Sequence, residues 1–570
     1  MEREVICMER KVAIGIQSFD KLREDNHFYV DKTSFIKEWW ESGDDVTLIM
    51  RPYCFGKTLN MSMLETFFSI KYENRGDLFE GLSIWKEEKY QKMQGTYPVI
   101  SLSLASIKSR DYKQARYAMI HLIIELYSKY NFIFESEALK ETNKDFVKQV
   151  SFEMNDVDIT VAIHKLCEYL YQYYGKKVII LLDAFDIPMK EAHRQGYWEE
   201  WVSFIGSMFH CMFKVNPYLE RGMMVGITSI SQESIFSDLN NIKFVTTTSN
   251  EYATSFGFTE EEVFASLEEY GLEKEKERVM QWYGGFSFAT YKNIYNPWCI
   301  LKFLREGIYE TYWADVNSNG LIDKTIREGN SEIKELFEDL LNGKLIRCKI
   351  NEQFIYKQLD RDENAIWSFL LTRGYLKVLS YEKMNLVRDR EVLCDVALTN
   401  YEVKHMFYSM VRAWFYSVKR DYNGFLKALL RDDVEEMNEY MNRITRDIFS
   451  YFDTAKTPSE SEPEKFYHGF VLGLMIELIG EYRLTSNRES GFGRYDVMLE
   501  PVDKNKNAII IEFKVHNPKK EKSLEETVEI ALKQIENKQY EASLIAKGFE
   551  REGIKKYGFA FEGKKVLIGE

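Results

Sequence analysis

The segment from Val46 to Phe68 constrains the fold of this chain most. A short apolar run, Val46–Met50, predicts a buried strand, and after Gly56-Lys57-Thr58 apolar residues recur at helical spacing. Strand, Gly-Lys-Thr and helix in that order is the context that a phosphate-binding loop requires. Helix-start N–H groups attract phosphate oxygens. We therefore expect Gly56 and Lys57 to contact nucleotide phosphates, and Thr58 to hold Mg²⁺.

A second segment, Lys176–Asp186, supports this interpretation. Its apolar run ends on Asp183, which is typical of an acid that helps to hold nucleotide-bound Mg²⁺. Asp183 could instead cap the turn that follows. Two positions depart from the usual pattern. Arg51 stands where the first glycine of G-x-x-x-x-G-K-[ST] is expected, and Ala184 stands where a Glu normally activates the attacking water.

Strands and helices alternate through this half of the chain. Further apolar runs at Tyr97–Leu104 and Met223–Ser229 predict two more strands. Alternating strands and helices, with phosphate-binding residues at strand ends, predict a parallel, doubly wound α/β sheet. The end of the last run, at Thr228 and Ser229, would then lie where a nucleotide sensor is expected.

The stretch Gly491–Val515 predicts a β-hairpin, because two apolar-rich strands flank the polar turn Asp503–Asn507. If the strands pair symmetrically about Lys504, one face carries three apolar pairs. These pairs are Tyr495 with Phe513, Val497 with Ile511, and Leu499 with Ile509. Since side chains alternate along a strand, the other face then carries Asp496 opposite Glu512, with Lys514 beside Glu512.

This polar face predicts a metal site. Directly opposed residues have Cβ atoms about 5 Å apart, and two carboxylates at that distance repel each other unless a cation lies between them. Mg²⁺ or Mn²⁺ held by Asp496 and Glu512 would meet that need. Lys514 would position or activate water and stabilise developing charge during phosphodiester hydrolysis. The alternative is an ordinary solvated Glu-x-Lys pair on the wet face of a strand.

Composition limits the kind of partner. The chain has 570 residues, of which 45% are hydrophobic, enough for several packed cores. Its net charge of −14 argues against a protein that coats nucleic acid, so any nucleic-acid contact is expected to be local. The C-terminal end has a local supply of lysines that suits such a contact, although all of them could be ordinary solvated side chains: Lys519, Lys520, Lys522, Lys533, Lys538, Lys555 and Lys556.

Cysteine spacing and hydropathy favour a reduced, cytoplasmic protein. None of the 7 cysteines lies in a C-x-x-C pair, so neither a zinc site nor a disulfide framework is indicated. No signal-peptide pattern and no uncharged run long enough to span a membrane is present, so no membrane partner is expected.

Three domains are expected. Residues 1–285 would form the nucleotide-binding domain, and residues 286–450 a helix-rich region like a lid or winged helix. Residues 451–570 would contain the hairpin. The polar stretch Thr454–Lys465 is predicted to be a linker.

Several stretches together resemble bacterial AAA-ATPase-like proteins that end in a PD-(D/E)XK nuclease-like domain. They include G-I-Q-S-F-D-K-L-R, R-P-x-x-F-G-K-T-L-N-M-S, V-I-I-L-L-D, W-Y-G-G-F-S-F and Y-N-P-W-C-I-L, and the resemblance covers nearly the whole chain. It implies a P-loop NTPase-like sheet that binds ATP, and a restriction-endonuclease-like C-terminal domain whose D-x(15)-E-x-K residues are Asp496, Glu512 and Lys514. Relatives often form rings, so an oligomer is possible, although no arginine finger is located.

The resemblance also implies roles for two further residues. Gln534, in Q-I-x-x-K-x-Y, would lie near substrate, with a packing role equally open. Glu477 is a candidate to complete the metal site, with a solvated side chain as the alternative. Arg488 and Arg494, at the edge of the hairpin, could hold a phosphate.

This chain departs from the family pattern where phosphoryl transfer needs charge. Tyr53 and Cys54 replace two arginines, Ala184 replaces a glutamate, Ser229 an arginine and Gln232 a lysine. Losing one transition-state donor or base typically costs a factor of about 10²–10³. The sequence thus predicts weak or lost ATP hydrolysis, with nucleotide binding through Lys57, Thr58 and Asp183 still possible.

Two functions remain open from the sequence. One is a metal-dependent nuclease that the nucleotide domain regulates or positions. The other is a non-catalytic, ATP-sensing binding or assembly protein that uses a nuclease-like fold for nucleic-acid or protein contacts.

Overall fold

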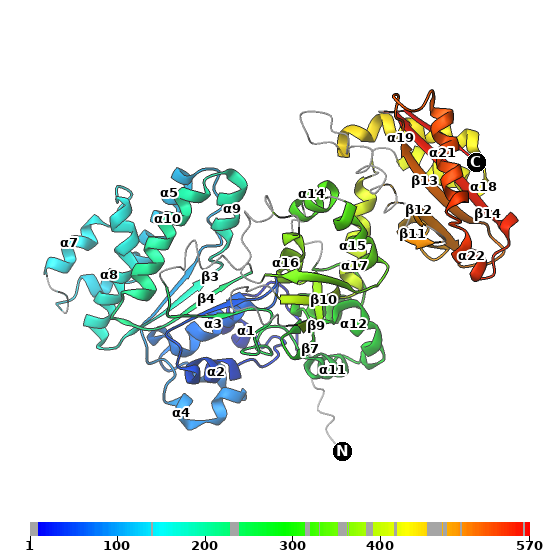
Figure 1. Cartoon of the computed structure of the whole chain (residues 1–570). Helices are drawn as coiled ribbons and strands as arrows, with labels where there is room; N and C mark the ends of the chain where they lie inside the picture. Colours follow the sequence, from blue (N-terminus) through cyan, green and yellow to red (C-terminus); the bar gives the residue numbers. More distant parts are fainter. Residues whose placement is uncertain are drawn as a thin grey trace, which may run out of the picture. The chain divides into compact units, whose positions relative to one another are not determined.

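The computed structural model describes residues 10–137, 139, 141–227, 239–313, 320–329, 331–351, 362, 364–382, 392–414, 416, 419–452, 470, 473, 476–490, 493–562 and 565–570. The chain forms two compact units (Figure 1). Unit 1 comprises Met1–Asn317 and Arg347–Val403, and unit 2 comprises Ser318–Ile346 and Lys404–Glu570. The predicted middle region contributes to both units, and the division into three domains stays a prediction.

Unit 1 is built on a five-stranded sheet whose strands all pair in parallel, as the alternation of strands and helices predicts. In sheet order the strands are β2 (Val99–Ser103), β3 (Val178–Asp183), β4 (Leu219–Gly226), β1 (Val46–Met50) and β5 (Ile242–Val245). Strand β4 therefore lies between the strand that leads into Gly-Lys-Thr and the strand that ends on Asp183.

Helices cover both faces of this sheet. One face packs against α5 (Tyr112–Ser128), α8 (Asp156–Tyr174) and α10 (Trp198–Phe209), and the other against α1 (Phe19–Glu24), α2 (Ser34–Ser42) and α3 (Lys57–Phe68) (Figure 1). Neighbouring residues of β1 belong to opposite cores, with Leu48 in the first and Ile49 in the second. Burial on both faces explains why the strand sequences are apolar without alternation.

The remaining elements of unit 1 are mostly helical, with one small hairpin and one three-stranded sheet in the order β8-β10-β9. The helices are α4 (Glu88–Gln91), α6 (Asn131–Phe134), α7 (Glu141–Gln149), α9 (Ile187–Gln195), α11 (Glu260–Glu269), α12 (Lys276–Tyr283), α13 (Pro297–Glu306) and α16 (Ala365–Thr372). The strands are β6 (Phe286–Phe288), β7 (Tyr291–Ile294), β8 (Ile346–Ile350), β9 (Leu376–Glu382) and β10 (Val392–Leu398).

Unit 2 has a mixed five-stranded sheet in the chain order of its strands. They are β11 (Tyr482–Ser490), β12 (Gly493–Pro501), β13 (Ala508–Val515), β14 (Ile554–Glu562) and β15 (Lys565–Gly569). Among the described strand pairs of this sheet, only β13 and β14 are parallel. The helices are α14 (Gly320–Glu328), α15 (Ser331–Leu341), most of α17 (Tyr401–Trp414), α18 (Lys419–Arg431), α19 (Val434–Phe452), α21 (Leu524–Asn537) and α22 (Ala542–Ala546).

The predicted hairpin is confirmed, together with the register of two of its three predicted apolar pairs, whereas the pair of Tyr495 with Phe513 and the opposition of Asp496 to Glu512 stay predictions. Val497 pairs with Ile511 and Leu499 with Ile509 in an antiparallel ladder. Helix α21 lies close against the neighbouring strand because Gly558 leaves room. A Cβ atom at that position would come within 2.9 Å of the Val528 carbonyl oxygen. Gly558 is the parallel partner of Glu512, so the close approach brings α21 next to the polar face of the hairpin.

Side chains from helices close both edges of the unit 2 sheet. On β15, the Asn438 carboxamide exchanges hydrogen bonds of 2.9 and 2.8 Å with the Ile568 backbone, and Asn442 does the same at Val566. On β11, the Ser486 N–H donates to the Glu338 carboxylate at 3.0 Å. Open strand edges are prone to pair with other chains, and these contacts occupy backbone groups on both edges.

Some expectations fall outside the described residues. These are the linker Thr454–Lys465, the strand end at Thr228 and Ser229, Gln232, and the side chains of Tyr495, Arg488 and Arg494. Across the segments that are described, no helix is both long and apolar enough to cross a membrane.

Candidate functional sites

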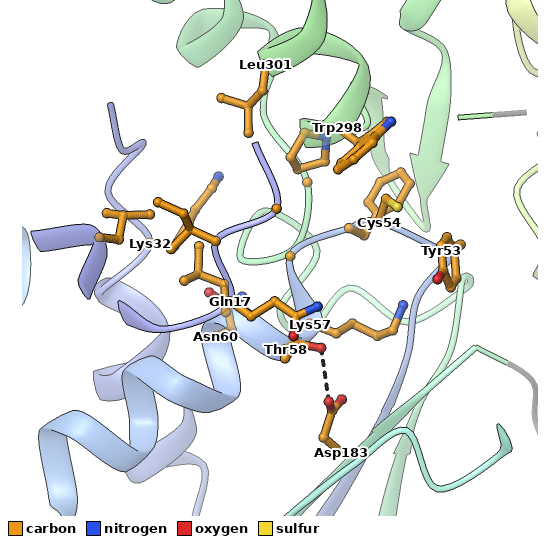
Figure 2. A pocket seen from close by; sticks show the side chains of 18 of the residues that line it. Gln17, Lys32, Tyr53, Cys54, Lys57, Thr58, Asn60, Asp183, Trp298 and Leu301 are labelled. Carbon is orange, nitrogen blue, oxygen red and sulfur yellow. Dashed lines mark hydrogen bonds between the residues drawn. The ribbon is translucent and has the colours of Figure 1, made fainter. Parts of the chain in front are cut away.

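A cavity of about 520 Å³ lies around the Gly-Lys-Thr loop of unit 1. Figure 2 shows Lys57, Thr58 and Asp183 at one part of it, with Trp298 and Leu301 from α13 at another. The volume falls within the range of small-ligand pockets. The structure thus brings Gly56, Lys57, Thr58 and Asp183 together, as the sequence predicts.

The loop bends sharply before α3. Gly56 precedes the first helical residue with a φ of 76°, and Cys54 also has a positive φ, of 63°. A left-handed conformation costs a non-glycine residue free energy, so Cys54 needs support from its surroundings. Part of it comes from Asn296, whose carboxamide donates to the carbonyl of Tyr53 at 3.1 Å.

Lys57 is turned toward its own loop. Its Nζ donates to the carbonyl oxygens of Arg51 at 2.9 Å and Pro52 at 2.6 Å. Burial lowers the pKa of the ammonium to about 8, and the carboxylates of Asp186 and Asp183 oppose that shift. To contact a phosphate, Lys57 would have to give up its hydrogen bonds to the loop carbonyls and form hydrogen bonds to phosphate oxygens instead.

Thr58 and Asp183 form the second contact of the pocket. The Thr58 hydroxyl donates to Asp183 Oδ2 at 3.0 Å, the bond drawn in Figure 2. Burial raises the pKa of Asp183, while the Thr58 hydrogen bond and the Lys57 charge lower it. A hydroxyl and a carboxylate oxygen side by side fit the hard-oxygen preference of Mg²⁺. Ala184, with a φ of 57°, follows Asp183 and brings no charge.

Arg51 has a role that the sequence did not reveal. It is fully buried, and its guanidinium lies 4.3 Å from the centre of the Phe288 ring. It donates to the carbonyl oxygens of Met50 at 3.0 Å and Thr246 at 2.7 Å. The residue in place of the first glycine therefore ties the start of the loop to the end of β5. An arginine directly after a buried strand was the available signal.

The other part of the pocket is apolar, and the sequence did not predict it. It is lined by two regions far apart in the chain, the N-terminal segment with Ile16 and Phe28, and α13 with Trp298 and Leu301. Aromatic and aliphatic walls of this kind suit a nucleobase. Only the three-dimensional fold brings these segments beside the phosphate-binding loop.

We call Asp496, Glu512 and Lys514 of unit 2 the hairpin cluster. Lys514 Nζ lies 3.1 Å from Glu512 Oε1, and Asp496 Oδ2 accepts the backbone N–H of Phe513 at 2.7 Å. The Glu512 side chain is only 1% exposed, and its Oε2 has no hydrogen-bond partner among the described residues. A buried carboxylate oxygen without a partner is costly, which is the condition that a bound cation relieves.

Both carboxyls of the hairpin cluster have raised pKa values. Burial is the main cause for Glu512, and the charge of Asp496 raises its pKa further, against the opposing charge of Lys514. Burial also raises the pKa of Asp496, while the Phe513 N–H and Lys514 lower it. The two groups are therefore held close enough to influence each other, as opposed residues of a hairpin would be.

Helix α21 adds Gln534 to this cluster. The Gln534 carboxamide donates to Glu512 Oε1 and lies 3.0 Å from the hydroxyl of Tyr540. Gln534 thus contacts a candidate metal ligand, while Tyr540, 1% exposed, holds the carboxamide. The sequence left a packing role open for Gln534, and the contact with Glu512 favours a role at the cluster.

Comparisons with known proteins identify two domains. A family model described as a predicted AAA-ATPase matches residues 13–236, and a model of the PD-(D/E)XK nuclease superfamily matches residues 462–570. The chain joins an AAA-ATPase-like domain to a PD-(D/E)XK nuclease-superfamily domain. Domains of these two kinds generally use a nucleotide and a divalent metal.

One curated relative is an uncharacterized protein in the vnfD 5′ region of Azotobacter chroococcum mcd 1. It is 25% identical over 313 residues, which cover 54% of this chain and 54% of that protein. The chain therefore spans about half the length of this relative.

Other candidates in the nuclease-superfamily domain have structural partners. Glu477 accepts from Arg412 Nε at 2.8 Å, so an ion pair accounts for its charge. His, Cys, Asp and Glu side chains do not gather in metal-binding groups of three or more within the described segments. A metal at the hairpin cluster would therefore draw its side-chain ligands from Asp496 and Glu512.

Proposed function

We propose that the PD-(D/E)XK domain hydrolyses nucleic-acid phosphodiester bonds with Mg²⁺ or Mn²⁺ held by Asp496 and Glu512. The buried Glu512 Oε2 without a described partner carries this proposal, because it lies in the same cluster as a second carboxylate. Oxygen ligands of this kind are those that both metals prefer. A bound metal would polarise the phosphoryl oxygen and lower the pKa of a coordinated water.

The residues of this chain would divide the remaining work. Gln534 orients Glu512 through its hydrogen bond to Oε1, and Tyr540 holds Gln534 in turn. Lys514, which is 30% exposed, can reach both Glu512 and a substrate phosphate. Its ammonium would stabilise the charge that develops on the phosphoryl oxygens.

For the AAA-ATPase-like domain we propose nucleotide binding with weakened or lost hydrolysis. Binding is supported by the Gly56–Thr58 loop, the Thr58–Asp183 contact and the apolar walls that suit a nucleobase. Loss of hydrolysis is supported by Ala184 beside Asp183, because this position brings no carboxylate to activate water. Tyr53 and Cys54 likewise bring no positive charge to the loop.

A cleavage assay tests the nuclease proposal. Supercoiled plasmid and single-stranded DNA and RNA are incubated with Mg²⁺ or Mn²⁺, with wild type, Lys514→Ala and a matched control, Asp503→Asn, in the exposed hairpin turn. We expect metal-dependent cleavage by wild type and the control, and a loss of about 10²–10³-fold in Lys514→Ala. Equal activity in all three would remove the assignment.

The second candidate is a non-catalytic, nucleotide-sensing binding protein. The missing charges around the phosphate-binding loop favour it for unit 1. It predicts that nucleic acid binds but is cleaved by no variant and with no metal, and that wild-type and Asp496→Asn proteins bind equally well.

A further inference from the structure

The loop between β13 and α21, residues 516–523, carries three lysines next to the hairpin cluster. We call it the lysine loop. Its lysines are Lys519, Lys520 and Lys522, and all three are exposed. Over the segments that the structure describes, no carboxylate forms an ion pair with any of them.

Three other lysines of this domain are already paired. Lys533 pairs with Glu529 at 3.2 Å, Lys556 with Glu541 at 3.5 Å, and Lys555 with Asp432. The positive charges that the sequence indicated in this domain are therefore not all available to a ligand. Among these seven lysines, those without an ion pair in the described residues are the three of the lysine loop and Lys538, whereas the other three positions are neutralised.

A buried network shapes the lysine loop. Glu521 Oε2 accepts the Asn517 backbone N–H at 3.0 Å and the Thr527 hydroxyl at 2.7 Å. The His516 ring, 6% exposed, lies 2.8 Å from the same hydroxyl and 3.4 Å from Glu521. Since Thr527 is 1% exposed on α21, the network ties the loop to the helix that also carries Gln534.

The backbone at the lysines is held as well. The Lys519 N–H donates to Asn517 Oδ1 at 3.1 Å, and the Lys522 N–H donates to the Glu526 carboxylate at 2.6 Å. The loop begins where the sheet still pairs, because the His516 N–H donates to the Phe561 carbonyl at 2.8 Å. The lysine side chains thus have no ion-pair partner in the described part of the chain, while backbone hydrogen bonds hold their positions.

We propose that the lysine loop binds the phosphate backbone of nucleic acid and holds it at the hairpin cluster. The inference rests on the proposed nuclease function and adds the surface that the substrate uses. Glu512 and Lys514 lie on β13, and the lysine loop follows this strand directly. One stretch of chain would therefore carry both the catalytic residues and the residues that bind substrate. Lysine ammonium groups commonly contact phosphates, and the loop contains no Phe, Tyr or Trp for base stacking.

The loop also fits the acidity of the chain. With a net charge of −14, long-range attraction of a polyanion is unfavourable. A pre-shaped group of three unpaired cations lets nucleic acid bind at one place, because little ordering of the backbone is needed on contact. Binding should therefore be local, strongly salt-dependent and largely independent of sequence.

Equilibrium binding tests this proposal separately from cleavage. Labelled DNA and RNA duplexes of equal length are titrated in Ca²⁺, and affinity is measured by fluorescence anisotropy over a series of KCl concentrations. The variant is K519A/K520A/K522A. The matched control, K419A/K427A/K565A, removes the same charge from exposed positions of α18 and β15. Melting temperatures check that both fold.

We expect the lysine-loop variant to lose about 10²-fold in affinity, and its slope of log K against log salt to fall by about 2–3. The control should stay within about threefold of wild type, because its lysines lie outside the loop. A wild-type affinity in the lysine-loop variant, or an equal loss in the control, would overturn the proposal. Binding through the loop without any metal-dependent cleavage would instead overturn the nuclease function.

The network supplies a second test. Thr527→Val removes the hydroxyl that joins Glu521 and His516 but leaves every lysine. We expect an affinity loss of roughly threefold to tenfold with an unchanged salt slope, and recovery in Thr527→Ser. Wild-type affinity in Thr527→Val would show that the network does not position the lysine loop.

Discussion

The two candidate sites of this chain differ in whether their charged groups have hydrogen-bond partners. In the AAA-ATPase-like pocket, Lys57 is hydrogen-bonded to loop carbonyls and Asp183 to Thr58. In the hairpin cluster, the buried Glu512 lies near the half-buried Asp496, and Glu512 Oε2 has no described partner. Burying like charges without full compensation destabilises a fold. Groups that are already hydrogen-bonded show what the pocket could bind, whereas a buried carboxylate oxygen without a described partner marks where we expect a cation and chemistry.

The largest expected effect is the loss of nucleic-acid cleavage when the hairpin cluster is mutated. Asp496→Asn keeps the shape of the side chain but removes a metal ligand, and we expect cleavage to fall by about 10³-fold or more, beyond the loss from a single transition-state donor. Removing the metal with EDTA should have the same effect on wild type, and added Mn²⁺ should restore only the wild type. Cleavage that survives both treatments would place the chemistry elsewhere.

A smaller effect is expected at the pocket. Lys57→Ala removes the charged hydrogen-bond donor, which should weaken ATP or ADP binding by about 10–10²-fold. Isothermal titration calorimetry measures it, with the exposed Lys92→Ala as the control. Cleavage of naked DNA without nucleotide should be unchanged in Lys57→Ala. If nucleotide affinity is the same in all three proteins, the pocket does not bind through its phosphate-binding loop.

Gln534→Ala tests whether Gln534 supports the metal ligand Glu512 or only packs against it. Outer partners of metal ligands typically contribute about 10–100-fold to affinity or activity, and we expect about a tenfold loss in cleavage with weaker Mn²⁺ binding. Glu536→Ala, exposed on the same helix, serves as the control. A pure packing role would instead lower the melting temperature and leave Mn²⁺ affinity unchanged.

The smallest effect concerns stability. Folding raises the pKa of Glu512. Below the ordinary carboxyl pKa the side chain is protonated in both states, so it does not lower the free energy of unfolding. As the pH rises through the raised pKa, the carboxyl ionises in the folded protein and the free energy of unfolding falls. The metal-free protein should therefore lose stability between about pH 4.5 and about pH 7 and level off above that, and Glu512→Gln should recover roughly 1–3 kcal/mol near pH 8. Urea unfolding measures it, with the exposed Glu529→Gln as the control. If Glu512→Gln is less stable than the wild type near pH 8, the claim that the ionised Glu512 side chain destabilises the metal-free protein is contradicted.

Local patterns in the sequence predicted much of the fold. The parallel sheet follows from apolar runs and their polar ends, and the hairpin register from period-two alternation about Lys504. Contacts between distant segments could not be predicted in this way. The place of Trp298 beside the phosphate-binding loop depends on how α13 packs, which no local pattern encodes.

The same limit applies to partners of single residues. Arg51 looked like a missing glycine, because its partners Thr246 and Phe288 are far away in the chain. The lysines of the C-terminal domain looked equivalent, because the acidic partners of Lys555 and Lys556, which are Asp432 and Glu541, are distant in the sequence. The contact of Gln534 with Glu512 depends on the close packing of α21 at Gly558, and the place near substrate that the family resemblance implied stays a prediction.

The central claim is that chemistry belongs to the hairpin cluster and not to the nucleotide pocket. Parallel measurement of DNA cleavage and ATP hydrolysis in one preparation tests it most directly, with Asp496→Asn and Lys57→Ala beside the wild type. The account predicts metal-dependent cleavage that Asp496→Asn abolishes, and ATP hydrolysis no faster than in Lys57→Ala. ATP hydrolysis that Lys57→Ala removes, together with cleavage that Asp496→Asn leaves intact, would contradict it.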